Sequence, residues 1–550
     1  MHKFSLYTGS ILFEELIVQN VVPLNDGQKV YDLPANLKTG PWDAIVIGSG
    51  MGGMCCAAAL SKVGKKVLVL EQHYLPGGYT HMFTRKGFVW DVGVHAIGEL
   101  DGKGPLAKMF RWLCEDQVKW QTLGADYDSF YFKDEAKIAF PNSKAEYIRR
   151  LKQMFPDEVQ KIDKYFEYVA KARKNAEIYF ALKSFPEWFD RIGSKILDTF
   201  RTNWWNVTTE EVLAELEISE KLKTVLTAQW GYHGNTPDHA SFAINALVVE
   251  HFADGAYYPV GGSKSLAESL LGIVKRNGGQ TVCRVSVDKI LTENNKAYGV
   301  RLKNGTEVFA PLVISAAGAR TTVTKLLPGE HQSQDWARQI SKLKDSPSYI
   351  SLYLGFEGDI EKAGASATNR WFFSTWARDE ETWNVADKDC RPPILYVSFP
   401  SLKDPEHIPG EHRKHTGEVV TFVPWELFQQ WKDTDPKKRP EEYLALKQEI
   451  TERVLKELRS HMPELMEMLT YFELGTPLTS EHFVAASQGA IYGLDSSPER
   501  FACKKLRTRT PIKGFYMTGV DVTATGVGGG ITSGLLTAAS INPRIYTKMI

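Results

Sequence analysis

The stretch DAIVIGSGMGGMCCAAALSKVGKKVLVLE, residues 43–71, decides the fold. Its first apolar run, AIVI at residues 44–47, is typical of a short buried strand. The small residues of MCCAAALSKVG predict a helix that ends near Gly64, and KKVLVLE predicts a second strand. A strand, a glycine-rich turn, a helix and a second strand form a βαβ unit, so the sequence predicts an α/β domain.

The turn GSGMGG, residues 48–53, has glycines where a dinucleotide site needs them. Gly48 permits the tight turn, Gly50 lets a pyrophosphate approach the backbone, and Gly53 lets the helix pack closely on the strand. The start of the helix offers free N–H groups to the phosphates. Glu71 ends the second strand, where its carboxylate can accept both ribose hydroxyls and disfavours the 2′-phosphate of NADP. A purely structural glycine-rich turn is the alternative interpretation.

The segment after Glu71 distinguishes FAD from NAD. The pair Gly77-Gly78 follows closely, a basic residue, Arg85 or Lys86, comes soon after, and GFVWDVGVH at residues 87–95 predicts a short hairpin strand. This run resembles the extended dinucleotide motif of the flavin amine oxidase and phytoene desaturase superfamily. In that superfamily the acid holds the adenosine ribose of FAD, and the glycine pair leads the chain past the cofactor. The resemblance therefore implies FAD as the cofactor.

A second glycine-rich segment lies near the C-terminus, in GFYMTGVDVTATGVGGGITSGLLTAASI at residues 514–541. It predicts a strand followed by a helix, and it resembles the closing motif of the same superfamily. The resemblance implies that Asp521 anchors the ribityl or pyrophosphate portion of FAD. It also implies that the N–H groups near Gly529, Gly530 and Ile531 face the N1–O2 edge of the flavin, where a helix N-terminus stabilises the anionic reduced form.

Residues 255–318 supply a third part of the expected FAD domain. They predict a strand, a turn and a helix, and then alternating strands with turns at residues 294–295 and 304–305. The resemblance implies that this block contacts the adenine near Val287 and ends with a last strand at Gly318. The sequence has no second GxGxxG turn with a following acid. A separate nicotinamide domain is therefore not expected, and the electron donor or acceptor stays unknown.

The residues expected to contact FAD come from these three separate stretches. They are Gly48, Gly50, Met51, Gly52, Gly53, Glu71, Gln72, Gly77, Gly78, Tyr79, Arg85, Val287, Ala317, Gly318, Gly519, Asp521, Gly529, Gly530 and Ile531. The expected architecture is an α/β, Rossmann-like FAD-binding domain of the amine oxidase type with an interleaved α+β substrate domain. We expect an N-terminal extension at 1–42, FAD-binding parts at 43–110, 251–325 and 481–550, and substrate-domain parts at 111–250 and 326–480.

Five stretches narrow the resemblance to one branch of the superfamily. They are EQH at 71–73, GGYTHMF at 77–83, DVGVHAIG at 91–98, HFADGAYYPVGGSKSLAE at 251–268 and GAIYG at 489–493. Together they look most like the branch of retinol saturase, the carotenoid isomerases and the phytoene desaturases, and they are closest to the retinol saturase pattern. The resemblance implies saturation, desaturation or isomerisation of a carbon–carbon double bond in a long apolar polyene. The C-terminal glycine run departs from the retinol saturase pattern, so the exact substrate stays open.

Chemistry at a double bond needs a hydride path through the flavin and, usually, a proton donor or acceptor opposite it. His81 and His95 flank the loop expected to pass the flavin, and Tyr492 lies in GAIYG. These three are the catalytic candidates, since histidine is the natural proton shuttle near neutral pH. The stretch QWGYHGNTPDHASF at residues 229–242 adds one tyrosine and two histidines. For each of them a hydrogen-bonded structural role is the alternative, and the spacing of His and Cys predicts no metal site.

The charges and the cysteines limit the partners and the compartment. Lys plus Arg equals Asp plus Glu at 66 each, so no basic field draws the chain toward nucleic acid. The six cysteines are scattered without a CxxC pair, and the sequence shows neither a signal peptide nor a run of about 18 apolar residues. We therefore expect a cytoplasmic protein without a spanning helix, with which peripheral binding to a membrane surface is compatible.

One stretch, residues 178–207, mixes many aromatic residues with basic ones. This composition fits a membrane interface or the mouth of a lipid tunnel, and it equally fits an aromatic core.

Two other functions are compatible with the same motifs. A fatty-acyl desaturase or reductase would need the same flavin and a similar apolar tunnel, so the sequence does not separate it from a polyene enzyme. Rab escort and GDP-dissociation-inhibitor proteins share the fold of the superfamily and hold prenyl lipids without FAD, so a non-catalytic lipid escort is an alternative of another class. The complete set of motif glycines and acids favours a bound cofactor.

Overall fold

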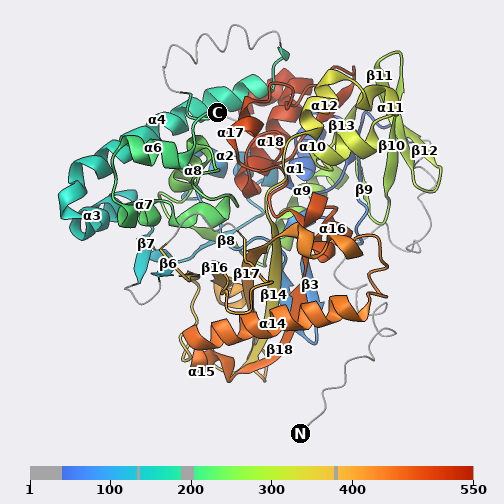
Figure 1. Ribbon diagram of the computed structural model, residues 1–550. Helices are drawn as coiled ribbons and strands as arrows, with labels where there is room; N and C mark the ends of the chain where they lie inside the picture. The colour runs from blue at the N-terminus through green and yellow to red at the C-terminus, as the bar shows by residue number, and fades with distance from the viewer. Residues whose placement is uncertain (1–36, 38–39, 133–136, 188–202, 377–381, 549–550) are drawn as a thin grey trace.

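The structure is a computed structural model that describes residues 37, 40–132, 137–187, 203–376 and 382–548. A parallel sheet of five strands, in the order β19-β13-β1-β2-β9, lies in its upper half (Figure 1). The strands are β1 (Ala44–Ile47), β2 (Val67–Leu70), β9 (Gln280–Val282), β13 (Val313–Ser315) and β19 (Phe515–Met517). The three motif-bearing stretches, far apart in the sequence, therefore meet in one sheet.

The βαβ unit predicted at the start of the chain is confirmed. Helix α1 (Met51–Lys62) follows β1 and ends before Gly64, whose φ of +86° turns the chain toward β2. The helix is buried over nearly its whole length, because α18 (Gly526–Ile541) packs along it. A Cβ atom at Gly534 of α18 would lie only 2.7 Å from the Cβ atom of Cys55, so this glycine lets the two helices approach closely.

Two predicted hairpins are also present. Strands β3 (Met82–Arg85) and β4 (Phe88–Asp91) form one, and β10 (Val287–Glu293) and β11 (Lys296–Leu302) form the other. Strand β12 (Glu307–Phe309) pairs with the other edge of β11. Lys86 and Gly87 join β3 to β4, and Asn294 and Asn295 join β10 to β11. All four have positive φ, which is the conformation that two-residue hairpin turns need. These turns set the register of both hairpins, and the one at Asn294-Asn295 is the turn that the sequence predicted.

A mixed sheet of seven strands forms the lower half of the molecule, in the order β18-β14-β17-β16-β15-β6-β7 (Figure 1). The strands are β6 (Asp126–Phe132), β7 (Ile138–Pro141), β14 (Ser348–Glu357), β15 (Asn369–Phe373), β16 (Ile394–Ser398), β17 (Lys414–Val423) and β18 (Leu469–Gly475). Only β15 and β6 run parallel; the other neighbouring pairs are antiparallel. Helix α14 (Glu441–His461) crosses the lower end of this sheet and buries Ile450, Val454 and Leu458.

The remaining helices surround the two sheets. They are α2 (Pro105–Cys114), α3 (Lys144–Met154), α4 (Val159–Lys183), α6 (Thr209–Glu215), α7 (Glu220–Leu226), α8 (Phe242–His251), α9 (Lys264–Arg276), α10 (Ala319–Thr321), α11 (Gly329–Gln332), α12 (Asp335–Ser341), α13 (Pro400–Lys403), α15 (Pro463–Met466), α16 (Pro477–Val484) and α17 (Pro498–Ala502). The short strands β5 (Trp120–Thr122) and β8 (Tyr257–Pro259) pair with each other. Three of the expected domain boundaries, at 110, 250 and 480, fall inside α2, α8 and α16.

The aromatic stretch at residues 178–207 belongs to the core wherever the structure describes it. Tyr179 stacks on Trp205 with ring centroids 4.3 Å apart, and Trp204 and Trp205 are buried. Residues 188–202, which carry Trp188, Phe189, Phe200 and three of the four basic side chains of the stretch, lie outside the described residues. For the described part, the aromatic-core interpretation is confirmed.

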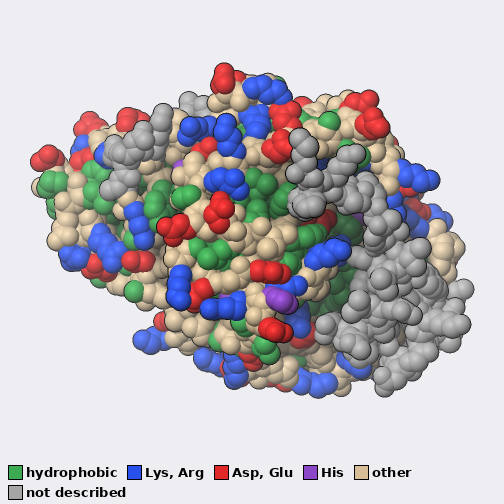
Figure 2. Space-filling model, turned by 90° about the horizontal axis from the view of Figure 1, so that it is seen from below, with side chains coloured by type: hydrophobic (Ala, Val, Ile, Leu, Met, Phe, Trp, Pro, Cys, Tyr) green, Lys and Arg blue, Asp and Glu red, His purple; other side chains and the backbone are tan. Residues whose placement is uncertain are grey.

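The described surface carries both signs of charge. On the face seen from below, acidic and basic side chains are interspersed (Figure 2). None of the described helices is long and apolar enough to cross a membrane.

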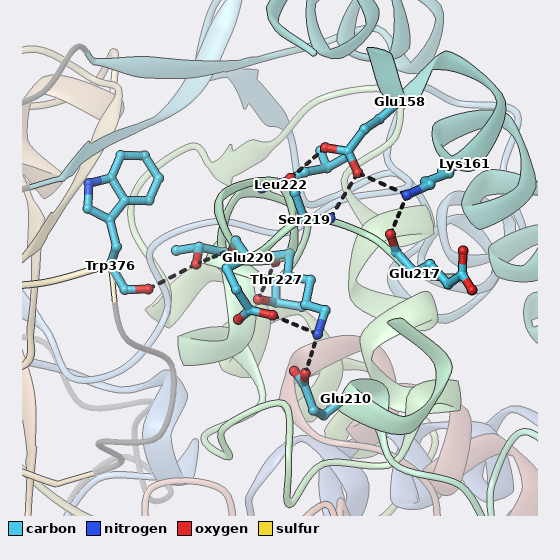
Figure 3. A network of polar contacts seen from close by, with 11 residues as sticks. Glu158, Lys161, Glu210, Glu217, Ser219, Glu220, Leu222, Thr227 and Trp376 are labelled. Carbon is cyan, nitrogen blue, oxygen red and sulfur yellow. Dashed lines mark hydrogen bonds and ion pairs between the residues drawn. The ribbon is translucent and has the colours of Figure 1, made fainter. Parts of the chain in front are cut away.

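Polar contacts fix helix α7 (Figure 3). Glu158 accepts hydrogen bonds from both the N–H and the hydroxyl of Ser219, which is the N-cap residue of α7. Lys223 of α7 is paired with two acidic side chains. A 3-10 helix, Ala228–Tyr232, follows α7 after Thr227.

Candidate active site

One cavity of about 910 Å³ is lined by residues of both sheets and of α4 and α8. At one end its walls are the loops that follow β1, β2, β13 and β19. At the other end the walls are apolar. They include Ile244, Leu247, Phe252, Trp371, Ile394 and Phe422. The predicted cofactor site and an apolar compartment are therefore parts of one continuous space.

The turn after β1 is shaped for a phosphate group. Gly48 has a φ of +93°, and a Cβ atom at Gly53 would lie 2.2 Å from the carbonyl oxygen of Gly48. A Cβ atom at Gly50, in contrast, would meet no atom within 4 Å. Gly50 is also the N-cap residue of α1 and offers no capping side chain, so the first N–H groups of the helix are free for a ligand. The turn therefore fits the pyrophosphate of FAD.

Glu71 is buried at the end of β2 and is already held by protein donors. Its Oε2 atom accepts hydrogen bonds from the N–H and the hydroxyl of Ser49, at 2.8 and 2.5 Å. Its Oε1 atom accepts one from the N–H of His73 at 2.8 Å. A carboxylate accepts about four hydrogen bonds in all. Glu71 therefore has room for about one ribose hydroxyl, rather than the two expected from the sequence.

Asp521 joins three loops that line the cavity. Its carboxylate accepts hydrogen bonds from the N–H groups of Ala319, at 2.6 Å, and Leu494, at 2.8 Å. Behind it, the fully buried guanidinium of Arg500 donates to the carbonyl oxygens of Leu494 and Val520. Because Arg500 lies outside the recognisable motifs, nothing in the sequence pointed to its role in holding this loop.

Most of the predicted cofactor residues line the cavity. They are Gly48, Gly50, Met51, Gly52, Glu71, Gln72, Gly77, Gly78, Tyr79, Val287, Ala317, Gly318, Gly519, Asp521 and Gly529. Four do not line it: Gly53, Arg85, Gly530 and Ile531. Gly53 instead permits the close packing of α1 on the turn, which is the role predicted for it.

The other three residues correct the predicted site. Arg85 ends β3 on the side of β18, where its side chain lies 3.9 Å from Glu473. Gly530 packs against Met51, and Ile531 is fully buried in the core. Helix α18 begins at Gly526, so its unpaired N–H groups are those of the first turn, a few positions earlier than the sequence indicated.

His95 lines the cavity, whereas His81 does not. The ring of His95 lies beside Tyr396, and burial, reinforced by the nearby Lys403, lowers the pKa of His95 to about 3. His81 is turned away: its Nδ1 atom lies 2.6 Å from the carbonyl oxygen of Gly78. Burial lowers the pKa of His81 to about 4. The structure therefore retains His95 as a catalytic candidate and argues against His81.

Tyr492 also lines the cavity, and its hydroxyl donates to the carbonyl oxygen of Gly231 at 3.1 Å. Burial raises its pKa. Tyr232 from the 229–242 stretch lines the cavity too, but His233 and His239 do not. The cavity lining thus contains His95 and several tyrosines, and also His73 and His251.

A buried polar network lies behind His95, and sequence reasoning missed it. The Lys403 ammonium donates to the carbonyl oxygen of His95 at 2.7 Å, to Oδ1 of Asn369 at 2.5 Å and to Oγ of Ser398 at 2.6 Å. Its three donors therefore have three acceptors. Burial lowers the pKa of Lys403 to about 7, against the opposing effect of nearby carboxyl groups, with Asp128 the largest of these.

Asp128 occupies the far end of this network. It accepts hydrogen bonds from Nδ2 of Asn369 and from the hydroxyl of Tyr232, both at 3.0 Å. Burial raises the pKa of Asp128 to about 6. The signal in the sequence was a charged residue inside an apolar strand run, DYDSFYF, but that pattern does not tell which way the side chain points.

Comparisons with known proteins agree with this geometry. The family model described as flavin containing amine oxidoreductase matches residues 51–542. The chain is 34% identical over 522 residues to the all-trans-retinol 13,14-reductase of Danio rerio, a match that covers 91% of this chain and 85% of that protein. It is 27% identical over 486 residues to prolycopene isomerase 1, chloroplastic, of an Oncidium hybrid cultivar, covering 87% and 80%.

A solved structure shares the fold. A putrescine oxidase variant from a redesign of cofactor binding superposes with a TM-score of 0.61 at 14% identity, covering 91% of this chain and 99% of that one. At this identity the likeness shows the fold alone.

Proposed function

The chain belongs to the flavin containing amine oxidoreductase family, and from this membership we propose that it uses FAD to act on a carbon–carbon double bond of a long apolar polyene of the retinol or carotenoid kind. Reduction of the double bond is the reaction we place first, because the relative named as a reductase is more similar to this chain than the one named as an isomerase.

One observation carries this proposal. The cavity of about 910 Å³ runs without interruption from the dinucleotide turn to a compartment walled by aliphatic and aromatic side chains. Its volume lies at the upper end of what ligand sites usually enclose, so it suits a large cofactor together with an apolar substrate.

FAD, when bound, supplies two-electron redox chemistry at its flavin ring. The chain supplies the rest. The helix N-termini of α1 and α18 would face the phosphates and the flavin edge, and Glu71 would accept a hydrogen bond from a ribose hydroxyl. The apolar walls exclude water and align the polyene, and His95 is placed to hold or move a proton.

The test is anaerobic and reads product masses. Purified FAD-loaded protein is reduced and then mixed, in detergent, with a retinoid, a carotenoid or an unsaturated fatty acid. A gain of two hydrogens in the retinoid or carotenoid would support the proposal. An unchanged mass with an altered retention time would identify an isomerase instead.

The alternatives give different results in the same assay. A gain confined to the fatty acid would identify the fatty-acyl reductase. A protein that stays colourless after incubation with FAD but binds the polyene would be a lipid escort. No change in any substrate, with FAD bound and reduced, would count against reduction, and the oxidised protein would then be tested with the saturated compounds.

We also propose that the protein meets its substrate at a membrane surface from the cytoplasmic side. An apolar polyene dissolves in lipid rather than in water, so a peripheral enzyme gains access by binding the surface. Co-flotation of the protein with liposomes would support this, and a protein that never floats at low salt would contradict it.

A further inference from the structure

A pair of opposite charges lines the cavity near an opening to the surface. Glu99, in the loop between β4 and α2, accepts a hydrogen bond from Nη2 of Arg173 on α4 at 2.8 Å. Both side chains line the cavity, and each is 23% exposed. Lys108 of α2 and Glu177 of α4 also line the cavity and are exposed on the surface, so the cavity opens between these two helices.

The backbone at Glu99 has an unusual conformation. Its φ is +55°, in the left-handed region that a residue with a Cβ atom seldom adopts. The residues on either side enforce this conformation, because Leu100 is buried in the core and the N–H of Gly98 donates to Nε2 of His251 at 2.8 Å. Left-handed backbone of this kind is often found at ligand-binding positions. Here it places a charged side chain in the cavity lining between two buried neighbours.

His251 fixes the carboxylate of Glu99. Because Nε2 of His251 accepts the hydrogen bond from Gly98, the ring proton is on Nδ1, which lies 3.4 Å from Oε2 of Glu99. Burial acts to raise the pKa of Glu99, but the hydrogen bonds from His251 and Arg173 and the charge of Arg173 outweigh it and lower this pKa. Glu99 is therefore an ionised carboxylate in a fixed orientation.

Both members of the pair keep hydrogen-bonding capacity for a ligand. A carboxylate accepts about four hydrogen bonds, and Glu99 receives two from the described residues. A guanidinium group has five N–H donors, and within the described part of the chain Arg173 makes its one hydrogen bond to Glu99. A hydroxyl group can donate to a carboxylate and accept from a guanidinium at the same time. A neutral alcohol therefore satisfies both members of the pair.

On α8, the face that carries His251 is otherwise apolar where it lines the cavity. Its other lining residues are Ile244, Leu247 and Val248, at the i, i+3 and i+4 spacing of one helix face. At 1.5 Å per residue, this face extends about 10 Å from Ile244 to His251. A polyene chain that packs along it brings its terminal group to the charged pair.

We propose that Glu99 and Arg173 bind the terminal hydroxyl group of the polyene and make the site selective for a polyene alcohol over the matching acid and hydrocarbon. This inference rests on the proposed function and narrows its substrate class. The carboxylate of an acid would meet the charge of Glu99 and compete with it for Arg173. A hydrocarbon would displace water from the pair and return no hydrogen bond. His251 is a positioning residue, which acts through Glu99.

Equilibrium binding tests the pair without turnover. Oxidised, FAD-loaded protein is titrated in detergent with retinol, with retinoic acid and with the hydrocarbon that carries a methyl group in place of the CH2OH group of retinol. Quenching of protein fluorescence reports the binding. The wild type should bind retinol about ten- to a hundredfold more tightly than either analogue, as expected for a hydrogen bond to a charged group. The matched control, Glu146→Gln, breaks an exposed ion pair with Arg149 on α3 and should keep this preference.

Glu99→Gln should change the order of the affinities, because it releases Arg173 to pair with the acid. Its affinity for retinol should fall at least about tenfold, and its affinity for retinoic acid should rise above that of the wild type. A residue that only supports the fold would weaken the binding of all three compounds together. Arg173→Met, which removes the guanidinium group, should weaken retinol binding without any gain for retinoic acid, and it carries the test if E99Q fails to fold.

The failure of this inference differs from the failure of the proposed function. Equal affinities of the wild type for the three compounds, or a uniform loss in E99Q, would overturn the hydroxyl site even if the reduced protein adds hydrogen to a polyene. If the affinities change as expected but the reduced protein adds no hydrogen to retinol, the proposed reaction fails and the hydroxyl site stands. A wild type that binds none of the three compounds overturns both.

Discussion

The carboxylate of Asp521 accepts a hydrogen bond from the backbone N–H of Ala319 at 2.6 Å, and this contact ties the loop after β19 to the loop after β13. A second hydrogen bond, from the N–H of Leu494, adds a third segment. Asp521 therefore connects three segments of the chain by hydrogen bonds, in addition to lining the cofactor site.

Removing the carboxylate of Asp521 should lower both the stability of the protein and its affinity for FAD. Asp521→Ala leaves two buried N–H groups without an acceptor, and each such loss costs about 1–3 kcal/mol. Thermal unfolding of the FAD-free protein should show the stability loss, and a fluorescence titration should show the weaker binding. Asp288→Ala, at an exposed position, is the control and should change neither. An unaltered melting temperature of the FAD-free D521A protein would contradict the claim that the hydrogen bonds of Asp521 stabilise the fold.

Two glycines of the same turn should respond to alanine in opposite ways. Gly53→Ala places a Cβ atom 2.2 Å from the carbonyl oxygen of Gly48, so this variant should be strongly destabilised or fail to fold. Gly50→Ala meets open space at an ordinary φ of −64°, so the FAD-free protein should keep its melting temperature. The new methyl group would occupy the phosphate space, and FAD affinity should fall at least about tenfold, or about 1.4 kcal/mol. Equal effects of the two variants on stability would contradict this assignment.

Glu71 should matter more for FAD than for the fold. Glu71→Gln removes the negative charge that three protein donors and one ribose hydroxyl share, and charge-assisted hydrogen bonds contribute about 1.5–3 kcal/mol. FAD affinity should therefore fall about ten- to a hundredfold, measured by quenching of FAD fluorescence. Glu71→Arg should abolish binding, because a bulky cation would fill the ribose site. Glu115→Gln, on an exposed pair, should bind FAD like the wild type, and unchanged affinity in E71Q would refute the ribose role.

The parts of the fold that local sequence determines were predictable. The β1–α1–β2 unit and the turn at Asn294-Asn295 follow from short patterns in which each residue has one suitable conformation. The cofactor loops followed from the same patterns, although the free turn of α18 starts at Gly526 rather than near Gly530. The residue at which that helix begins depends on how the helix packs on α1, and no local sequence pattern encodes this packing.

The chemistry behind the cavity wall was not predictable. His81 and His95 stand on either side of one hairpin, and only the packing of that hairpin on the seven-stranded sheet decides that His95 faces the cavity. His95 and Lys403, which meet behind the cavity wall, lie 308 residues apart in the chain, and Lys403 belongs to no motif. Their meeting depends on the register between strands, a long-range property that spacing along the sequence does not reveal.

Four buried histidines should make the protein less stable as the solution is acidified. Burial lowers the pKa values of His73 and His81 to about 4 and those of His95 and His233 to about 3, from 6.5. Below about pH 6.5 the unfolded chain therefore binds protons at these histidines that the folded protein does not bind. Each histidine should remove up to about 1.4 kcal/mol of stability per pH unit until the pH reaches its folded-state pKa.

His233 isolates this effect, because neither of its buried ring nitrogens has a hydrogen-bond partner among the described residues. Asp128, whose pKa is raised to about 6, acts in the opposite sense over part of the same range, so only a difference between variants is informative. The free energy of unfolding of His233→Leu, measured in urea, should fall less steeply than that of the wild type as the pH is lowered from about 6.5 to about 4. The difference in slope should correspond to about one bound proton. His412→Leu, at an exposed position, should keep the wild-type slope. If the slope of H233L equals that of the wild type, His233 is charged in the folded protein, and the burial argument fails for the other three as well.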